Sequence, residues 1–565
     1  MRQRIILAAL CFLLTVLNIK AGESAYYYVG WLNNWSTTDK SYPLTLQDDG
    51  LTWEVTIPAP DGVGGWFKIA PASAYGKDDF WNLLYCAPYD GCRELSGTME
   101  YGNKGAWLLP DVVGAESFTI KIQPSTMQYL IVPNVGDPWS GTLPVLFIDT
   151  ESEVNSKEVY VKGKYYIDAL GLEGYQSLGT KENPLPLQIK GRGNWTWTGF
   201  NKKPYRLKFD SKASPLGMKS NKHFNLLANA DDHNAFLNNT VGFQLSRLLK
   251  LAYTPEQRPV EVVLNGDYIG LYMLTDKIRV EKNRVNIVEQ SDEETDPQNV
   301  TGGWLLEIDN YDEENQIRMT ESNGYTLRFT YHTPEVLSDV QKNYITDFLK
   351  ATDRAIYNTD KTSTEWEQYI DIDALARFYI VQEVMGDGES FHGSCYMSKD
   401  RGENTKLVFG PVWDFGNAFG CGTNRFIYVD PPFEQNWIGE IAKYPRFQQR
   451  VKAIWQPFLG DNYPQLDGFI DDFILQISDA AANDGRRWPE YSQSNINDRK
   501  NNFKNKISQK VNYLRQQWGN GISSIWAVPD DEADDDCWYG LDGRKINGVP
   551  TRHGLFIHKG RKVVL

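Results

Sequence analysis

The sequence predicts a multidomain α+β protein with an N-terminal β-sandwich, a long central region that is strand-rich first and helix-rich later, and a small β C-terminal tail. Three observations support this prediction. Short aromatic strands broken by Gly, Pro, Asn and Asp fill residues 24–135, strands precede helices across residues 136–525, and the acidic run DDEADDD marks a linker at 526–537 before a tail at 538–565. A chain of 565 residues is also too long for one core, so two to four domains are expected.

Residues 1–23 have the pattern of a signal peptide. MRQR is a basic start, IILAALCFLLTVLNI is an apolar stretch of signal-peptide length, and KAGESA is a small, polar exit. No later stretch has about 18 consecutive apolar residues, so no transmembrane span is expected after signal removal. The sequence therefore predicts an exported protein in the periplasm, at the cell surface or outside the cell.

The first folded region, residues 24–135, is expected to be the β-sandwich. YYYVGWLNNW, LTWEVTIPAP, SFTIKIQP and MQYLIVPN alternate or cluster aromatic and apolar residues between turn residues. Its tryptophans are either sandwich core or aromatic platforms that stack on sugar rings, and the glycan-binding candidates are Trp31, Trp35, Trp66 and Trp81.

The strand-and-turn pattern of YYYVGWLNNW resembles the sandwich modules of the outer-membrane starch-binding proteins SusE and SusF. This resemblance implies a glycan- or partner-binding module with polysaccharide as a candidate ligand. In the same region Cys86 and Cys92 flank a short turn in CAPYDGC, and either a disulfide or two free thiols fits an exported protein.

The central region begins with strands and continues with helices. LPVLFIDT, KEVYVKGKYYIDAL, LPLQIKGRGNW and KPYRLKFD are strand-like, and NAFLNNTVGFQLSRLLKL has helical spacing of its apolar residues. Asn265-Gly266 predicts a hairpin turn in RPVEVVLNGDYIGLYMLTDKI. Later helices are expected in 333–357, 371–386 and within 440–518.

Phosphoryl-transfer chemistry is suggested by VWDFG, in which Asp414 precedes Phe415 and Gly416. Such chemistry needs cations and backbone N–H groups over phosphates, carboxylates for magnesium, and a carboxylate near the acceptor hydroxyl. KGRGNW supplies Arg192 between two glycines. In the strand YRLKFD after it, Arg206 and Lys208 are expected on the face opposite to the aromatic and leucine side chains. Asp387 follows a predicted helix, and the two predicted strands between it and Asp414 would bring both carboxylates together.

Four blocks in order resemble the CotH family of atypical protein kinases, named after spore coat protein H. They are KGRGNWTW…KKPYRLKFD, KHFNLLANADDHNAFLNNTVGFQLSRLL, RPVEVVLNGDYIGLYMLTDKIRVEKNRVNI and GPVWDFGNAFG. The resemblance implies a kinase-like two-lobed fold, ATP and Mg²⁺, and transfer of the γ-phosphoryl group to Ser/Thr hydroxyls of a secreted or surface protein. Carried over by position, it implies catalytic and metal-binding roles for Asp414 and Asp387, and nucleotide or phosphate contacts for Arg192, Lys203, Lys208 and Trp413.

Two departures from the family pattern leave a second interpretation open. Gly416 stands where the family usually carries a second Asp, and the Asn expected in the catalytic loop is not visible after Asp387. The alternative is a non-catalytic surface protein that binds glycan or a partner and keeps the kinase-like region as a scaffold. A glycosidase is a third hypothesis, but no carboxylate pair can be singled out for it.

The tail and the overall charge complete the predictions. CWYGLDGRKINGVPTRHGLFIHKGRKVVL resembles the C-terminal modules of secreted Bacteroidetes proteins, which implies secretion and surface attachment; a simple terminal hairpin is the alternative. The net charge of −15, without a dominant basic cluster, argues against a nucleic-acid partner.

Overall fold

The computed structural model divides the chain into two compact units, Met1–Ser140 and Gly141–Leu565. It describes residues 26–60, 64–112, 115–429, 436–492 and 495–520, and in the tail 538–539, 545–546, 549–550, 555–558 and 561–564. The predicted signal peptide at 1–23 and the acidic linker at 526–537 lie outside the described residues. No helix in these described ranges is both long enough and apolar enough to cross a membrane.

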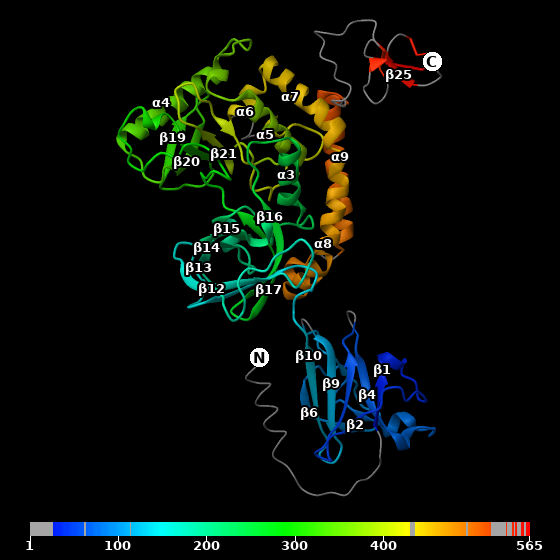
Figure 1. Ribbon diagram of the computed structural model, residues 1–565. Helices are drawn as coiled ribbons and strands as arrows, with labels where there is room; N and C mark the ends of the chain where they lie inside the picture. The colour runs from blue at the N-terminus through cyan, green and yellow to red at the C-terminus, as the bar shows by residue number, and fades with distance from the viewer. Residues whose placement is uncertain are drawn as a thin grey trace. The chain divides into compact units, whose positions relative to one another are not determined.

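Unit 1 is a sandwich of two antiparallel sheets (Figure 1). The first contains β1 (Tyr26–Gly30), β4 (Trp66–Pro71), β5 (Tyr85–Cys86) and β7 (Glu100–Tyr101), with β8 (Trp107–Leu108) paired to β4. The second has the order β2 (Thr45–Leu46), β3 (Trp53–Pro58), β9 (Ala115–Gln123), β10 (Gln128–Val135), β6 (Ser96–Thr98). Alternating apolar residues of both sheets, among them Tyr28, Phe67, Trp107, Ile120 and Tyr129, form its core.

Unit 2 begins with a closed barrel of seven strands in the order β11-β12-β13-β14-β15-β17-β16. The strands are β11 (Val145–Thr150), β12 (Val161–Asp168), β13 (Leu185–Gly191), β14 (Tyr205–Ala213), β15 (Asn221–Leu227), β16 (Gln257–Leu264) and β17 (Asp267–Asp276). Parallel pairing of β11 with β16 closes it. Leu187, Ile189, Leu207 and Phe224 lie in its core, so Arg206 and Lys208 on β14 face outward, as the alternation of YRLKFD predicts.

The rest of unit 2 is a helical lobe around a second sheet. Its strands, in the order β19-β20-β18-β21-β22, are β19 (Gln316–Thr320), β20 (Thr326–Thr333), β18 (Trp304–Ile308), β21 (Cys395–Lys399) and β22 (Val408–Phe409). Its helices are α3 (Leu237–Leu248), α4 (Asp339–Ile356), α5 (Ile372–Met385), α6 (Trp437–Ile441), α7 (Pro445–Pro457), α8 (Gln465–Arg487) and α9 (Ile496–Trp518). The helix α3 lies between β15 and β16 in sequence but packs in the core of this lobe.

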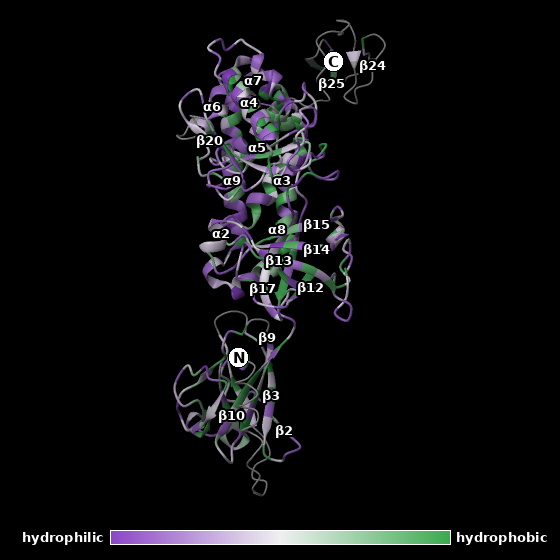
Figure 2. Cartoon of the chain, turned by 90° about the vertical axis from the view of Figure 1, so that its left-hand side faces the viewer, coloured by the Kyte–Doolittle hydropathy of each residue, from purple (hydrophilic) through white to green (hydrophobic). Residues whose placement is uncertain are grey.

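Long helices fasten the helical lobe to the barrel. Figure 1 shows α8 and α9 running side by side, and Lys504 of α9 pairs with Asp467 and Asp471 of α8. At the end of α8, Asp484 pairs with Lys202 at 2.7 Å and accepts a hydrogen bond from the Leu271 backbone in β17. In Figure 2 the barrel strands include hydrophobic segments, and many of the surrounding loops are hydrophilic.

The described part of the tail is a four-stranded antiparallel sheet of β24 (Lys545–Ile546), β23 (Trp538–Tyr539), β25 (Leu555–His558) and β26 (Arg561–Val564). The observed architecture thus confirms the predicted multidomain α+β fold with its N-terminal sandwich and β tail. The expected hairpin also forms, as β16 and β17 turning at Asn265-Gly266.

Candidate active site

A cavity of about 820 Å³ near the sequence-predicted residues is lined by both lobes of unit 2. We call it the main cavity. Arg192 reaches it from the end of β13, Asp231 from the loop between β15 and α3, Glu307 from β18, and Trp413 and Asp414 from the loop after β22. The structure therefore brings together three residues that sequence reasoning selected: Arg192, Trp413 and Asp414.

Arg192 and Trp413 are in direct contact. The Arg192 guanidinium lies 5.8 Å from the centroid of the Trp413 ring, and that ring stacks on Phe243 of α3 at 5.8 Å. The buried Nε of Arg192 has no hydrogen-bond partner among the described residues. Burial lowers the pKa of Arg192, while nearby Asp414 and Asp231 oppose that shift. A guanidinium with an unused donor in a cavity suits a phosphate or carboxylate of a ligand.

Asp414 is held in an uncommon backbone conformation. Its φ of 59° lies in the left-handed region, which costs energy for a non-glycine residue and is often found at functional sites. The next residue fixes this turn, because the Phe415 backbone N–H donates to Asn239 Oδ1 at 3.0 Å. The Phe415 ring also occupies the space where a side chain at Gly242 would lie. The Asp414 side chain is accessible from the cavity. The surrounding protein reduces its hydration and thereby raises its pKa, whereas the charge of Arg192 lowers it.

Gly416 borders two carboxylates. A Cβ at this position would lie 3.4 Å from Asp414 Oδ1 and 3.5 Å from Asp231 Oδ2, which is ordinary van der Waals contact. Asp231 therefore places a carboxylate beside the position from which a side chain at 416 would extend. Sequence reasoning missed Asp231, although NADDHN lies within one of the four family-like blocks and its paired aspartates were the available signal.

Asp387 and Glu389 lie in the loop after α5, but only Glu389 lines the main cavity. The Asp387 side chain is 1% exposed; its Oδ1 accepts the Glu389 backbone N–H at 3.2 Å, and its Oδ2 has no partner among the described residues. Burial raises the pKa of Asp387 well above its usual range, and the charges of Glu389 and Asp414 add to the shift. Burial and Asp414 also raise the pKa of Glu389.

The two lysines predicted to contact phosphate lie elsewhere. Lys203 donates to the Trp197 carbonyl at 2.7 Å and borders a separate cavity with Tyr205 and Tyr272. Lys208 lines another cavity, of about 620 Å³, which shares Asn315 and His332 with the main cavity. The preceding lysine, Lys202, does line the main cavity, but its ammonium is paired with Asp484.

The four tryptophans named in unit 1 differ in exposure. Trp35 and Trp81 form a surface pair with ring centroids 6.3 Å apart, and Trp81 is 36% exposed. Trp31 packs against the sandwich core, and Trp66 is half-buried beside Gly91. Cys86 and Cys92 are separate buried thiols, the first near the Gly102 carbonyl and the second near the Tyr129 hydroxyl, so they form no disulfide in this structure.

Comparisons with known proteins agree with this division of the chain. Residues 189–517, more than half of the sequence, match the family model described as CotH kinase protein. Residues 21–133 match the model described as SusF, first starch specific CBM, as the resemblance of YYYVGWLNNW predicts.

A solved structure, SusF from Bacteroides thetaiotaomicron, is similar at 13% identity with a TM-score of 0.19, over 32% of this chain and 48% of that one. The chain thus spans about half the length of this relative. No curated protein matches the sequence.

Proposed function

The chain belongs to the CotH kinase family, and from that premise we propose that unit 2 binds ATP with Mg²⁺ and transfers its γ-phosphoryl group to Ser/Thr hydroxyls of a secreted or surface protein. The observation that carries the proposal is the meeting of Arg192, Trp413 and Asp414 in one cavity. Phosphoryl transfer depends mainly on positioning and on neutralising charge, and these residues supply a cation, an aromatic ring and a carboxylate.

The residues present fit a magnesium ion that arrives with a nucleotide. Among the described residues no group of three or more His, Cys, Asp and Glu side chains could hold a metal by itself. Mg²⁺ does not need such a cage, because it keeps several waters and takes one or two carboxylates plus phosphate oxygens. Asp414 and Asp231, whose carboxylates both lie close to Gly416, are the residues that would hold it. Bound there, the ion would neutralise charge on the phosphates.

The charge of the main cavity determines how a nucleotide would enter. Seven carboxylates line it: Asp231, Asp232, Glu307, Asp309, Glu313, Glu389 and Asp414. Lys202 is already paired, so Arg192 is the cation in this lining that has an unused donor. Free ATP would be repelled by this lining, and we expect binding to require the metal complex.

The carboxylate that accepts the hydroxyl proton is assigned to the loop after α5. The base role implied for Asp387 stays a proposal, and its enclosed carboxylate would have to reach the cavity to act. Glu389 is the carboxylate of this loop that already lines the cavity, with Asp387 holding its backbone N–H. A group whose pKa is raised toward neutrality is suited to proton transfer.

The experiment is calorimetric titration of the full chain with ATP, with and without Mg²⁺. Wild type should bind only with the metal, and Asp414→Asn should weaken binding by about tenfold or more, which is about 1.4 kcal/mol. Asp347→Asn, on the exposed face of α4, is the matched control and should not change ATP binding.

A second assay tests phosphoryl transfer and the identity of the base. It measures incorporation of labelled phosphate into a Ser/Thr peptide pool and compares Asp387→Asn with Glu389→Gln. Absence of metal-dependent ATP binding would sink the kinase proposal.

We also propose that unit 1 binds an α-glucan. The specific observation is the surface pair Trp35 and Trp81, since paired aromatic faces stack on sugar rings. If ATP binding fails while glucan binding holds, the protein is a non-catalytic surface binder with a kinase-like scaffold. The SusF-like module and the signal-like residues 1–23 together support a periplasmic, cell-surface or extracellular location.

A further inference from the structure

One wall of the cavity that Lys208 lines is the outer face of the barrel. We call this cavity the basic cavity. Register places Lys208 opposite His223 on β15, and the Lys277 backbone N–H donates to the His223 carbonyl just beyond β17. These three side chains form one cross-strand row. The neighbouring row contains Lys190 and Arg206, which are paired directly.

Lys190 and Arg206 carry like charges directly opposite each other, which destabilises a sheet, so their pairing costs folding free energy. Arg279, two residues after Lys277, adds another cation to the same cavity. Within the described residues Arg206, Lys208, Lys277 and Arg279 form no ion pair, and the Nε atoms of Arg206 and Arg279 are buried without a partner. Lys190 and Lys208 lie over the ring of Tyr160, at 5.0 and 6.0 Å from its centroid, and Lys190 also donates to the Glu158 carbonyl at 3.5 Å.

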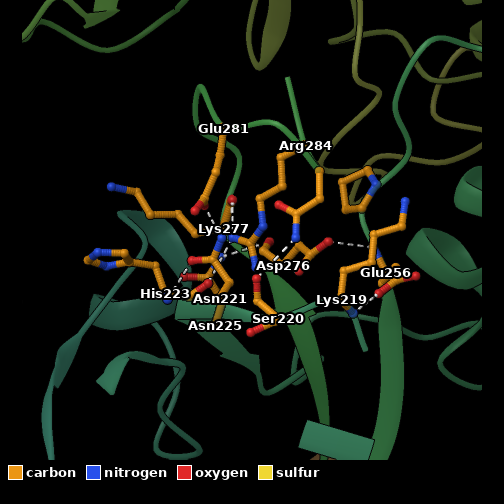
Figure 3. Close-up of polar contacts among 12 residues, drawn as sticks. Lys219, Ser220, Asn221, His223, Asn225, Glu256, Asp276, Lys277, Glu281 and Arg284 are labelled. Carbon is orange, nitrogen blue, oxygen red and sulfur yellow. Dashed lines mark hydrogen bonds and ion pairs between the residues drawn. The ribbon is translucent and has the colours of Figure 1, made fainter. Parts of the chain in front are cut away.

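A buried ion pair holds this cationic row in place. Figure 3 shows Arg284 next to Asp276, with which it pairs at 2.5 Å, both side chains being fully buried. The Arg284 guanidinium also donates to the backbone carbonyls of His223 and Lys277, at 2.9 and 2.7 Å. The loop after β17 is thereby fixed against β15, and the row cannot relax by moving its backbone apart.

Three carboxylates also line the cavity, and within the described residues none of them forms an ion pair with Lys208, Lys277 or Arg279. They are Glu289, Asp292 and Glu335; Asp292 Oδ1 accepts the backbone N–H groups of Glu335 and Val336, and the charge of Glu335 partly opposes the fall in the pKa of Lys277. His223 Nδ1 has no partner among the described residues, and burial together with the neighbouring cations lowers the pKa of His223 to about 3, so it is neutral. The same causes lower the pKa of Lys277 to about 7.

We propose that the basic cavity is a binding site for a multiply charged phosphate group, seated on Lys208, Lys277 and Arg279. Fixed cations that lack partners and converge on a cavity of about 620 Å³ are compensated when an oxyanion enters. The site is beside the main cavity, with which it shares Asn315 and His332, so its ligand lies next to the proposed nucleotide site. The phosphate group belongs either to the nucleotide's own tail or to a second molecule. The inference concerns residues that do not contact Asp414 in the main cavity, and it holds whether or not the protein transfers a phosphoryl group.

The test is calorimetric titration of the full chain with sodium tripolyphosphate, without metal or nucleotide. Lys208→Met and Lys277→Met should each weaken binding by about tenfold or more. Lys277→Met should also raise the melting temperature of the free protein, because it removes a cation from beside Arg206 and Arg279. Loss of affinity with a gain in stability separates a ligand-binding role from a structural one. Lys222→Met is the matched control, since its ammonium donates to the Asp210 carbonyl, and it should bind as wild type does.

Two arms distinguish the sources of the phosphate. If prior saturation with a non-hydrolysable ATP analogue and Mg²⁺ abolishes tripolyphosphate binding, the site takes the nucleotide's tail; if binding persists, it takes a phosphate of another molecule. The proposal is overturned if wild type does not bind tripolyphosphate, or if Lys277→Met and Lys208→Met bind it as tightly as Lys222→Met does. The two overturning outcomes are read without ATP or its analogue, so they are independent of whether the kinase proposal fails.

Discussion

Gly416 lies where two carboxylates from distant parts of the chain approach one point. The family's usual Asp is absent there, and Asp231 Oδ2 lies 3.5 Å from where the missing side chain would begin. Gly416 is not in the left-handed region, so an Asp can take its backbone conformation. Asp231, from the loop before α3, therefore places a carboxylate close to the position where an Asp side chain at 416 would begin.

This arrangement predicts a compensating pair of substitutions. Asp231→Asn should weaken Mn²⁺ binding in the presence of ATP by about tenfold, because one of two carboxylates is lost. Adding Gly416→Asp to that variant should restore most of the affinity. Electron paramagnetic resonance of bound Mn²⁺ measures both without reference to activity. Wild-type Mn²⁺ affinity in Asp231→Asn, together with a loss in Asp414→Asn, would show that Asp231 is not a ligand.

Lys277 gives a prediction on pH. Its pKa of about 7 means that it gains its charge as the pH falls through neutrality, whereas sulfate keeps its charge of two over this range. Sulfate affinity should therefore fall as pH rises from about 6 to about 8. The charged or titratable groups around Lys277 are Lys190, Arg206, Lys208, His223, Arg279, Glu289, Asp292, His332 and Glu335. Isothermal titration at several pH values should give a steep slope in wild type and in His332→Gln, and a shallow one in Lys277→Met. Equal slopes in all three would exclude Lys277 as the titrating group.

The positions of the site's side chains could be predicted from sequence only where the local backbone conformation determines them. Strand alternation correctly places Arg206 and Lys208 on the outer face of β14, because the side-chain period of a strand is two. No such rule separates Lys202 from Lys203, which lie in the loop before β14. Their positions depend on partners far along the chain: Asp484 for Lys202 and the Trp197 carbonyl for Lys203.

At the scale of elements, α5 and α9 are joined by a buried ion pair. Lys510 Nζ lies 2.9 Å from Glu383 Oε2, and neither side chain is exposed. Glu383 also accepts the Ile427 backbone N–H, and Lys510 donates to the Arg425 carbonyl. Since Asp387 and Glu389 follow directly after α5, this pair anchors the helix from which the proposed base loop leaves.

Removing one partner should therefore be costly. Lys510→Met leaves Glu383 charged and unpaired in the core, which costs about 3–5 kcal/mol. Glu383→Gln with Lys510→Met removes both charges and should recover a large part of that loss. Thermal unfolding monitored by circular dichroism measures the loss and the recovery of stability. The melting temperatures are compared for the unfolding transition that Lys510→Met shifts. A double variant as unstable as the single one would show that packing, and not the unpaired charge, sets the cost.

Element prediction succeeded where local signals are strong. The turn at Asn265-Gly266 defines the β16–β17 hairpin, and the spacing of apolar residues defines α3. The closure of the barrel was not predictable in this way, because β11 and β16 pair in parallel across more than a hundred residues. Likewise the placement of α3 in the helical core rather than on the barrel follows from tertiary packing of Leu237, Val241 and Phe243.

At the scale of the whole molecule, the chain has two compact units with separate hydrophobic cores. The proposed binding functions are divided between the units: glucan on unit 1, and a nucleotide and a phosphate group on unit 2. Units with their own cores can bind independently. Binding to one unit should therefore survive substitutions that abolish binding to the other.

The surface tryptophans of unit 1 test this independence. Trp35→Ala with Trp81→Ala should weaken binding to maltoheptaose by about tenfold or more, because stacking faces contribute about 1 kcal/mol each beyond buried area. Tyr89, which is 51% exposed on the same unit and hydrogen-bonded to Glu94, provides the control, and Tyr89→Ala should bind the sugar normally. Titrations of the same full-length variants with ATP and Mg²⁺ should match wild type. Loss of nucleotide binding with the tryptophan pair would mean that the two functions are coupled, and unchanged maltoheptaose affinity would place the glucan site elsewhere.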